Sequence, residues 1–164
     1  MRRTLQIVLL ALSTSALAQS PGGHTGHGGM AAQGFVLPDD PRTAVEIPPD
    51  VRAFLRYEMR GHLEQLATLM ARIGEGNFKQ AAAFARSGLG VMGNHPPGAP
   101  NPAQFVPPEF RMMGQAMHRA ANAVAEAGEA AVTPPSAADW KTMAAAAANL
   151  SAACAGCHGS FRLR

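Results

Sequence analysis

The sequence is poor in two kinds of residue that many folds and sites require. It contains only two cysteines among 164 residues. Two cysteines with no second ligand pair exclude a structural zinc site, which needs about four Cys or His ligands. A disulfide between these residues, which are three positions apart, would constrain almost nothing. β-Branched residues are also scarce beside the many alanines, which favours helices over sheets.

The chain also lacks a large excess of either positive or negative charge. The chain has 14 Lys and Arg against 11 Asp and Glu, a formal charge of +3. Two of the basic residues, Arg2 and Arg3, belong to the leader described next. Without them 12 basic residues face 11 acidic ones, so the net charge falls to +1. No clustered basic face of the kind that binds nucleic acid is apparent, and we expect no nucleic-acid partner.

The first 18 residues have the pattern of a secretory signal peptide. Arg2 and Arg3 form the charged start, and an apolar core follows over residues 5–12. Small residues at 16–18 form an A-x-A cleavage site, so the mature chain is expected to begin at Gln19. The apolar core is too short to span a bilayer, and no later segment is long and apolar enough. We therefore expect an exported protein without a membrane span.

Residues 19–48 are predicted to form a flexible tail rich in glycine and proline. Ser20–Gly29 has the composition of a flexible linker. His24 and His27 within it either bind a metal ion weakly or are incidental, and composition favours the second reading. Several prolines should keep the rest of the tail extended; they are Pro38, Pro41 and Pro48.

Residues 49–164 are predicted to form one all-α domain, an antiparallel four-helix bundle. A helix over residues 50–73 is followed by a second that starts at Asn77 and by a third that starts near Pro107. The fourth begins after Ser136, with Asp139 completing a capping box. A long proline-rich connection over residues 88–107 fits a crossover between helices of a bundle.

Three of these helices carry apolar residues at alternating spacings of three and four, which predicts one buried face on each. The first helix has Leu55, Met59, Leu63, Leu66, Met70 and Ile73 at these positions. The third has Phe110, Met113, Met117, Ala120, Val124 and Ala127. The fourth has Trp140, Met143, Ala147, Leu150, Cys154 and Cys157, so both cysteines continue its buried face.

The two cysteines form the sequence Cys154-Ala155-Gly156-Cys157-His158, which has the C-x-x-C-H spacing of c-type haem attachment. In that chemistry two thiols add across the haem vinyl groups as thioethers, and the next imidazole ligates the iron. On a helix, Cys154, Cys157 and His158 share one side. A thioredoxin-like redox pair would require a strand before the motif, and none is predicted. We therefore expect one covalent haem c.

Four amphipathic helices with C-x-x-C-H at the end of the fourth resemble the class II c-type cytochromes, the family of cytochromes c′ and low-spin c556-type cytochromes. The most specific part of the resemblance is the segment 154–162 near the C-terminus. It implies a haem in the core near the last helix, with His158 as proximal ligand and the sixth iron position facing the first helix. Haem attachment outside the cytoplasm is also implied, which places the protein in the periplasm.

The sixth ligand is the open question. In the c556-type branch a first-helix methionine ligates the iron, and Met59 is the candidate here; in cytochromes c′ the iron is five-coordinate. A thioether raises the potential of the iron and leaves no open site. Met59 could instead be core, and His62 is a weaker candidate ligand. The remaining methionines, Met70 and Met112 among them, are expected in the core, and His118 either lies near the haem or on the surface.

Two functions follow from this choice. The first is an electron carrier with His158 and Met59 on the iron, which turns over no substrate and exchanges electrons with periplasmic redox proteins. The second is a five-coordinate protein that binds nitric oxide or carbon monoxide. A sensor or a subunit of a larger redox complex is a third, weaker reading, and the sequence does not decide whether the chain is a homodimer. Arginines that could pair with the haem propionates are Arg56, Arg60 and Arg162, and Trp140 and Phe161 could pack on the porphyrin.

Overall fold

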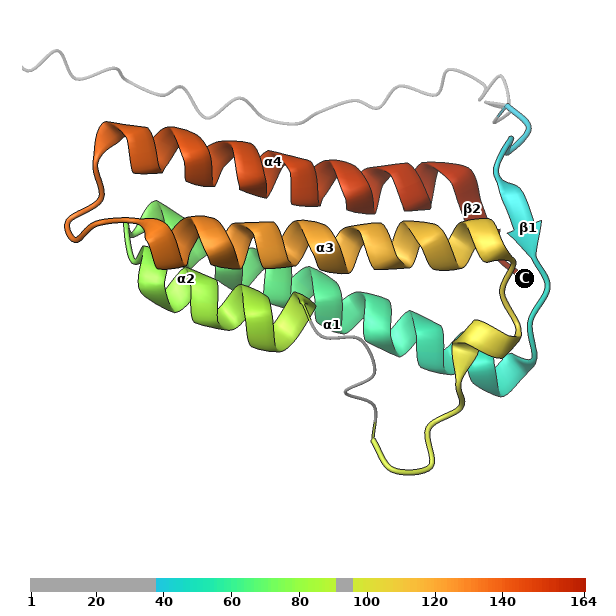
Figure 1. The fold of residues 1–164 in the computed structure, drawn as a ribbon. Helices are drawn as coiled ribbons and strands as arrows, with labels where there is room; N and C mark the ends of the chain where they lie inside the picture. The colour runs from blue at the N-terminus through green and yellow to red at the C-terminus, as the bar shows by residue number, and fades with distance from the viewer. Residues whose placement is uncertain (1–37, 91–95) are drawn as a thin grey trace, which may run out of the picture. The chain divides into compact units, whose positions relative to one another are not determined.

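The computed structural model describes residues 38–90 and 96–164, and this part of the chain is mostly helical (Figure 1). The all-α class expected from composition is confirmed. The four α-helices are α1 (Pro49–Gly74), α2 (Phe78–Phe84), α3 (Pro108–Ala130) and α4 (Ala137–Ser160). Shorter elements are the strands β1 (Thr43–Val45) and β2 (Phe161–Leu163), the π-helical turn η1 (Ala85–Leu89) and the 3₁₀ turn η2 (Pro102–Gln104).

The helix starts follow from local chemistry. Pro49 and Pro108 open α1 and α3, where proline costs nothing because the first N–H groups have no partner within the helix. The Ser136 side chain accepts from the Asp139 backbone N–H, and the Asp139 carboxylate accepts from the Ser136 backbone N–H at 2.9 Å. The predicted capping box of α4 is therefore present.

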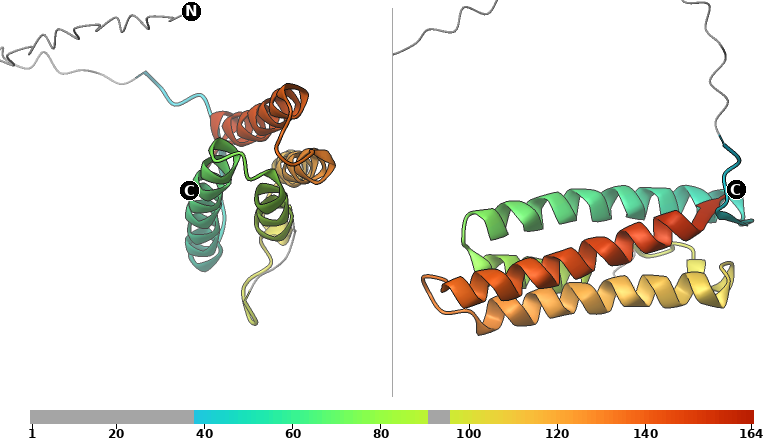
Figure 2. Two further views of the ribbon diagram at one scale, coloured as in Figure 1. Left: turned by 90° about the vertical axis from the view of Figure 1, so that its left-hand side faces the viewer. Right: turned by 90° about the horizontal axis from the view of Figure 1, so that it is seen from above.

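α3 and α4 lie side by side in opposite directions and make the most extensive contact between helices (Figures 1 and 2). α2 packs on α3, and α1 packs on α2 and η1. α1 is not among the elements that contact α4 extensively. The two strands form a parallel pair that joins the chain before α1 to the chain after α4.

The buried side chains form two separate groups. The main cluster lies among the second half of α1, α2, α3 and the first two thirds of α4, and includes Leu69, Phe78, Val124, Met143 and Leu150. The second cluster lies beside the strands and contains Val45, Ile47, Val51 and Val106, with Leu55, Phe110, Phe161 and Leu163 packed against it.

The second cluster corrects the predicted extent of the tail. The sequence predicts that residues 38–48 belong to a flexible tail, but Thr43–Val45 form a strand, and Val45 and Ile47 are buried. The prolines around this short apolar segment predict an extended tail. Its partner strand is 116 or more residues away, so the local sequence gives no sign of the strand pairing. The predicted signal peptide and the segment 19–37 lie outside the described residues.

The buried face of α1 also differs from the predicted one. Leu63 is 67% exposed and Met70 is 45% exposed, whereas Leu69 is fully buried. The inward row runs through Met59, His62, Leu66, Leu69 and Ile73, so His62 and Leu69 take the places predicted for Leu63 and Met70. The spacing alone supported either row, and the packing of α2 against Leu69 decided between them. Met112, expected in the core, is 57% exposed.

Candidate functional site

The two thiols lie in the last turns of α4, on the helix side that carries Ala147 and Leu150. Cys154 packs against the main cluster, and both cysteines are half-buried and free of a disulfide. His158 follows in the same turn and is exposed. Within the described residues no hydrogen bond or ion pair engages its imidazole ring. All three groups are therefore available to an external partner at one end of α4.

The thiols are held in the protonated form. Burial raises the pKa of Cys154 above its ordinary value. Burial also raises the pKa of Cys157, and the neighbouring charge of Cys154 raises it further. Both are therefore S–H groups at neutral pH, the form whose sulfur and hydrogen add together across a carbon–carbon double bond. Low-pKa thiolates of the kind used in disulfide exchange are not favoured here.

The site lies between the two hydrophobic clusters. Along α1 the order is Leu55 in the second cluster, then Met59, then Leu66 in the main cluster. Along α3 the order is Phe110 in the second cluster, then Met113, then Met117 in the main cluster. From β2 back into α4 the order is Phe161 in the second cluster, then Cys157, then Cys154 packed against the main cluster. We call the level of Met59, Met113 and Cys157 the intercluster level. These three side chains are half-buried and belong to neither cluster.

Two helical glycines lie near Met59 and Met113 in the sequence. Gly61 of α1 and Gly114 of α3 are half-buried, yet a Cβ atom added to either would meet no atom within 4 Å. By contrast, a Cβ at Gly128, in the main cluster region, would collide with the Phe78 carbonyl oxygen. Close packing thus holds the main cluster together, whereas no neighbouring element in the described part of the chain packs against α1 at Gly61 or against α3 at Gly114.

Met59 and His62 are the α1 residues nearest this level. Met59 is half-buried, as a ligand or a core residue would be. His62 faces His118 of α3, with ring centroids 6.3 Å apart and ring planes at 90°. His118 Nδ1 lies 2.6 Å from the Leu89 carbonyl oxygen at the end of η1. The structure therefore gives His62 and His118 a shared position between α1 and α3, which the sequence did not reveal.

Arg56 and Arg162, which are expected to pair with the haem propionates, differ in the contacts that they make within the chain. Arg56 is exposed and has no ion pair with a described carboxylate. Arg162 Nε lies 3.4 Å from Asp40 Oδ2, which is within ion-pair range, but the geometry is not that of a hydrogen bond. Its buried N–H therefore lacks an acceptor. Both arginines keep donors free for a carboxylate.

Arg60, Trp140 and Phe161 complete the residues considered from the sequence. Arg60 is exposed on α1. Phe161 packs edge-on against Phe110, with ring centroids 5.4 Å apart, at the second cluster. Trp140 packs against Phe78 at the first turn of α4. Since Cys154 and Cys157 lie at the other end of that helix, Trp140 does not reach them.

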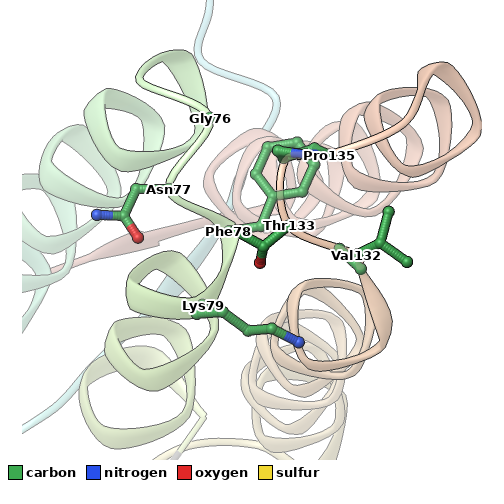
Figure 3. Close-up of a pocket in the computed structure, with 8 residues that line it drawn as sticks. Gly76, Asn77, Phe78, Lys79, Val132, Thr133 and Pro135 are labelled. Atoms are coloured by element: carbon green, nitrogen blue, oxygen red, sulfur yellow. The ribbon is translucent and has the colours of Figure 1, made fainter.

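Two hollows elsewhere do not provide this chemistry. One, of about 90 Å³, lies at the turns between α1 and α2 and between α3 and α4 (Figure 3). Its lining has no thiol, imidazole or carboxylate, and Lys79 donates there to the Glu129 carbonyl at 2.6 Å. The other, of about 350 Å³, is an open depression beside His118, Arg119 and Asn122.

The donor set fits a group held through thiols. In residues 38–90 and 96–164 no three His, Cys, Asp or Glu side chains gather closely enough to hold a metal ion. A metal site made by protein ligands alone is therefore not formed in this part of the chain. Two free, half-buried thiols and one unengaged imidazole match a covalently attached macrocycle with its own four iron ligands.

Comparison of the chain with protein-family models, with curated proteins and with solved structures found no match. Among the described helices, none is long and apolar enough to cross a membrane.

Proposed function

We propose that the chain is an exported electron carrier with one covalently attached haem c, around which α1 to α4 form an antiparallel four-helix bundle. The observation that carries the proposal is the pair of free, half-buried thiols of Cys154 and Cys157 with the exposed His158 ring beside them, at the end of α4 between two packed clusters. A haem bound there supplies one-electron redox chemistry.

Each residue of the site has a separate task in this proposal. Cys154 and Cys157 fix the macrocycle to α4, and each S–H adds across one vinyl group so that sulfur bonds one carbon and hydrogen goes to the other. His158 would supply an imidazole ligand to the iron. Met59 would supply a thioether from α1, a ligand that favours reduced iron. Arg56 and Arg162 donate to the propionates.

The proposed carrier converts no substrate and exchanges electrons with redox proteins of the periplasm. Export rests on the N-terminal pattern of charged residues, apolar core and A-x-A site. N-terminal sequencing of protein from the periplasmic fraction tests it, and the expected first residue is Gln19. A chain that retains Met1 and sediments with membranes would contradict the export proposal.

A second function follows if Met59, which is half-buried, stays in a packing role. A five-coordinate iron would then keep an open position that would admit nitric oxide or carbon monoxide. The two functions predict different spectra of the purified protein. The carrier is low-spin in both oxidation states and binds carbon monoxide slowly, and the gas binder is high-spin and binds it at once.

Covalent attachment is tested before the choice of function. Acid-acetone extraction should leave the haem on the chain, and the mass should exceed that of the mature polypeptide by one haem. A variant with Cys154→Ala and Cys157→Ala should lose stable attachment. The matched control is Ser151→Ala, an exposed change one turn earlier on α4. Colour that extracts freely from the unmodified chain would refute the proposal.

A further inference from the structure

The chain immediately after the attachment motif pairs with the chain immediately before α1. In the parallel pair, Thr43 lies opposite Phe161, Ala44 opposite Arg162 and Val45 opposite Leu163. The Arg164 N–H extends the pairing by donating to the Val45 carbonyl at 3.0 Å. Only residues 46–48 separate β1 from α1, and β2 begins three residues after His158.

A charged group reinforces this pairing at the end of α4. Arg42 forms a two-point contact with Asp40, with its Nε 2.9 Å from Oδ1 and its Nη2 2.8 Å from Oδ2. Its remaining nitrogen, Nη1, donates to the His158 carbonyl oxygen over 3.4 Å. That carbonyl belongs to the last turn of α4, where backbone oxygens lack partners within the helix and carry partial negative charge. A guanidinium is well suited to this position.

The two helices that would bear the axial ligands have little other direct connection. α4 packs on α3, and α1 packs on α2 and η1, whereas α1 and α4 do not contact each other extensively. At the end of α4 that carries His158, the strand pair and Arg42 connect it directly to the segment that leads into α1. The spacing between His158 on α4 and Met59 on α1 is therefore set at this end by these contacts together with the second cluster, in which Val51 and Leu55 of α1 pack with the β2 side chains.

We propose that Arg42, held in place by Asp40, is a positioning residue for His158. Together with the β1–β2 pair it fixes the end of α4 against the start of α1 and thereby sets the axial geometry at the iron. This inference rests on the proposed haem attachment, but not on which group is the sixth ligand. In this role Arg42 holds the end of α4 in place through hydrogen bonds, and it contacts neither iron nor substrate.

The test uses the full exported chain with its haem and compares Arg42→Ala with Arg72→Ala. Arg72 pairs with Glu75 at 2.9 Å, an equally exposed ion pair at the opposite end of α1. The first measurement is the electron paramagnetic resonance spectrum of the oxidised protein. Arg42→Ala should split or broaden the iron signal into more than one species, and Arg72→Ala should leave it unchanged.

The second measurement is hydrogen exchange of the Arg164 amide, which reports on the strand pair itself. Arg42→Ala should speed this exchange by about tenfold, as expected when a hydrogen bond to a charged group is lost. Arg42→Lys keeps the charge but cannot bridge Asp40 and the His158 carbonyl through a planar fork. It should show the same two changes to a smaller degree, and it remains measurable if Arg42→Ala folds poorly.

If neither Arg42→Ala nor Arg42→Lys changes the electron paramagnetic resonance spectrum of the iron, the inference is overturned and the proposed function stays intact. The same result follows if Arg72→Ala changes the signal as much as Arg42→Ala. A purified wild-type chain without covalent haem overturns the proposed function, and the positioning role with it. The extraction experiment described above therefore separates the two failures.

Discussion

At the scale of single residues, the role of Met59 distinguishes the two proposed functions. It lies on the inward row of α1, at the level of Cys157, and packs into neither hydrophobic cluster. A methionine used only for packing is expected within a cluster, as Met117 and Met143 are. Met113 of α3 is half-buried outside both clusters as well, so the ligand role proposed for Met59 is tested by substitution.

Replacing Met59 by alanine should convert low-spin iron to high-spin iron. The oxidised protein should lose its weak sulfur-to-iron band near the red limit of the visible, and it should bind carbon monoxide readily. The reduction potential should fall, since the soft thioether favours reduced iron. Absorption spectra in both oxidation states measure these changes, with Met112→Ala as a control because Met112 is 57% exposed.

Two results would contradict the assignment of Met59. A wild-type protein that is already high-spin would make Met59 a packing residue and favour the gas-binding function. A Met59→Ala variant that stays low-spin, while His62→Ala does not, would make His62 the ligand. His62 merits this comparison because the structure places it on the inward row, facing His118.

At the scale of elements, α2 and α3 pack tightly against each other at Gly128. A Cβ at this position would collide with the Phe78 carbonyl and come within 2.9 Å of the Ala82 side chain. Gly128→Ala should therefore destabilise the chain by about 1–3 kcal/mol, the usual cost of overpacking. Gly74→Ala, where an added Cβ meets nothing within 4 Å, should change stability by less than about 1 kcal/mol. Urea unfolding followed by circular dichroism measures both.

The capping box of α4 should make stability depend on pH. Hydrogen bonds from the Ser136 side chain and backbone lower the pKa of Asp139. A lowered folded-state pKa means that the stabilisation is complete above the ordinary carboxyl pKa of about 4 and is lost as pH falls through the lowered value. The difference in unfolding midpoint between wild type and Asp139→Asn should be constant from about pH 5 to 8 and shrink below about pH 4. A difference that stays constant at low pH would contradict this role.

At the scale of the whole molecule, the compact unit begins at Asp39. The glycine-rich composition of residues 20–29 predicts protease cleavage before that point. Limited proteolysis of the mature chain should yield a stable haem-bearing fragment that starts close to Asp39, identified by mass and N-terminal sequencing. A fragment that starts near Pro49 would show that β1 does not protect the chain, and protection from Gln19 onward would show that the tail is docked.

Much of this protein could be predicted from its sequence because the signals are local. The helix starts at Pro49, Pro108 and Ser136 depend on neighbouring residues only, and all three are present. The attachment motif is equally local, since the spacing of Cys154, Cys157 and His158 places them on one side of any helix. The all-α class follows from composition in the same way.

Only the tertiary structure decided the features that depend on distant partners. β1 forms because Phe161–Leu163 lies beside it, and Leu69 rather than Met70 is buried because α2 packs there. The contact of Arg42 with the His158 carbonyl joins residues 116 positions apart. No periodicity encodes such pairs, since spacing determines which residues share a face but not which neighbour that face meets. That choice is made by packing, and it places Met59, Met113 and Cys157 at one level between two cores.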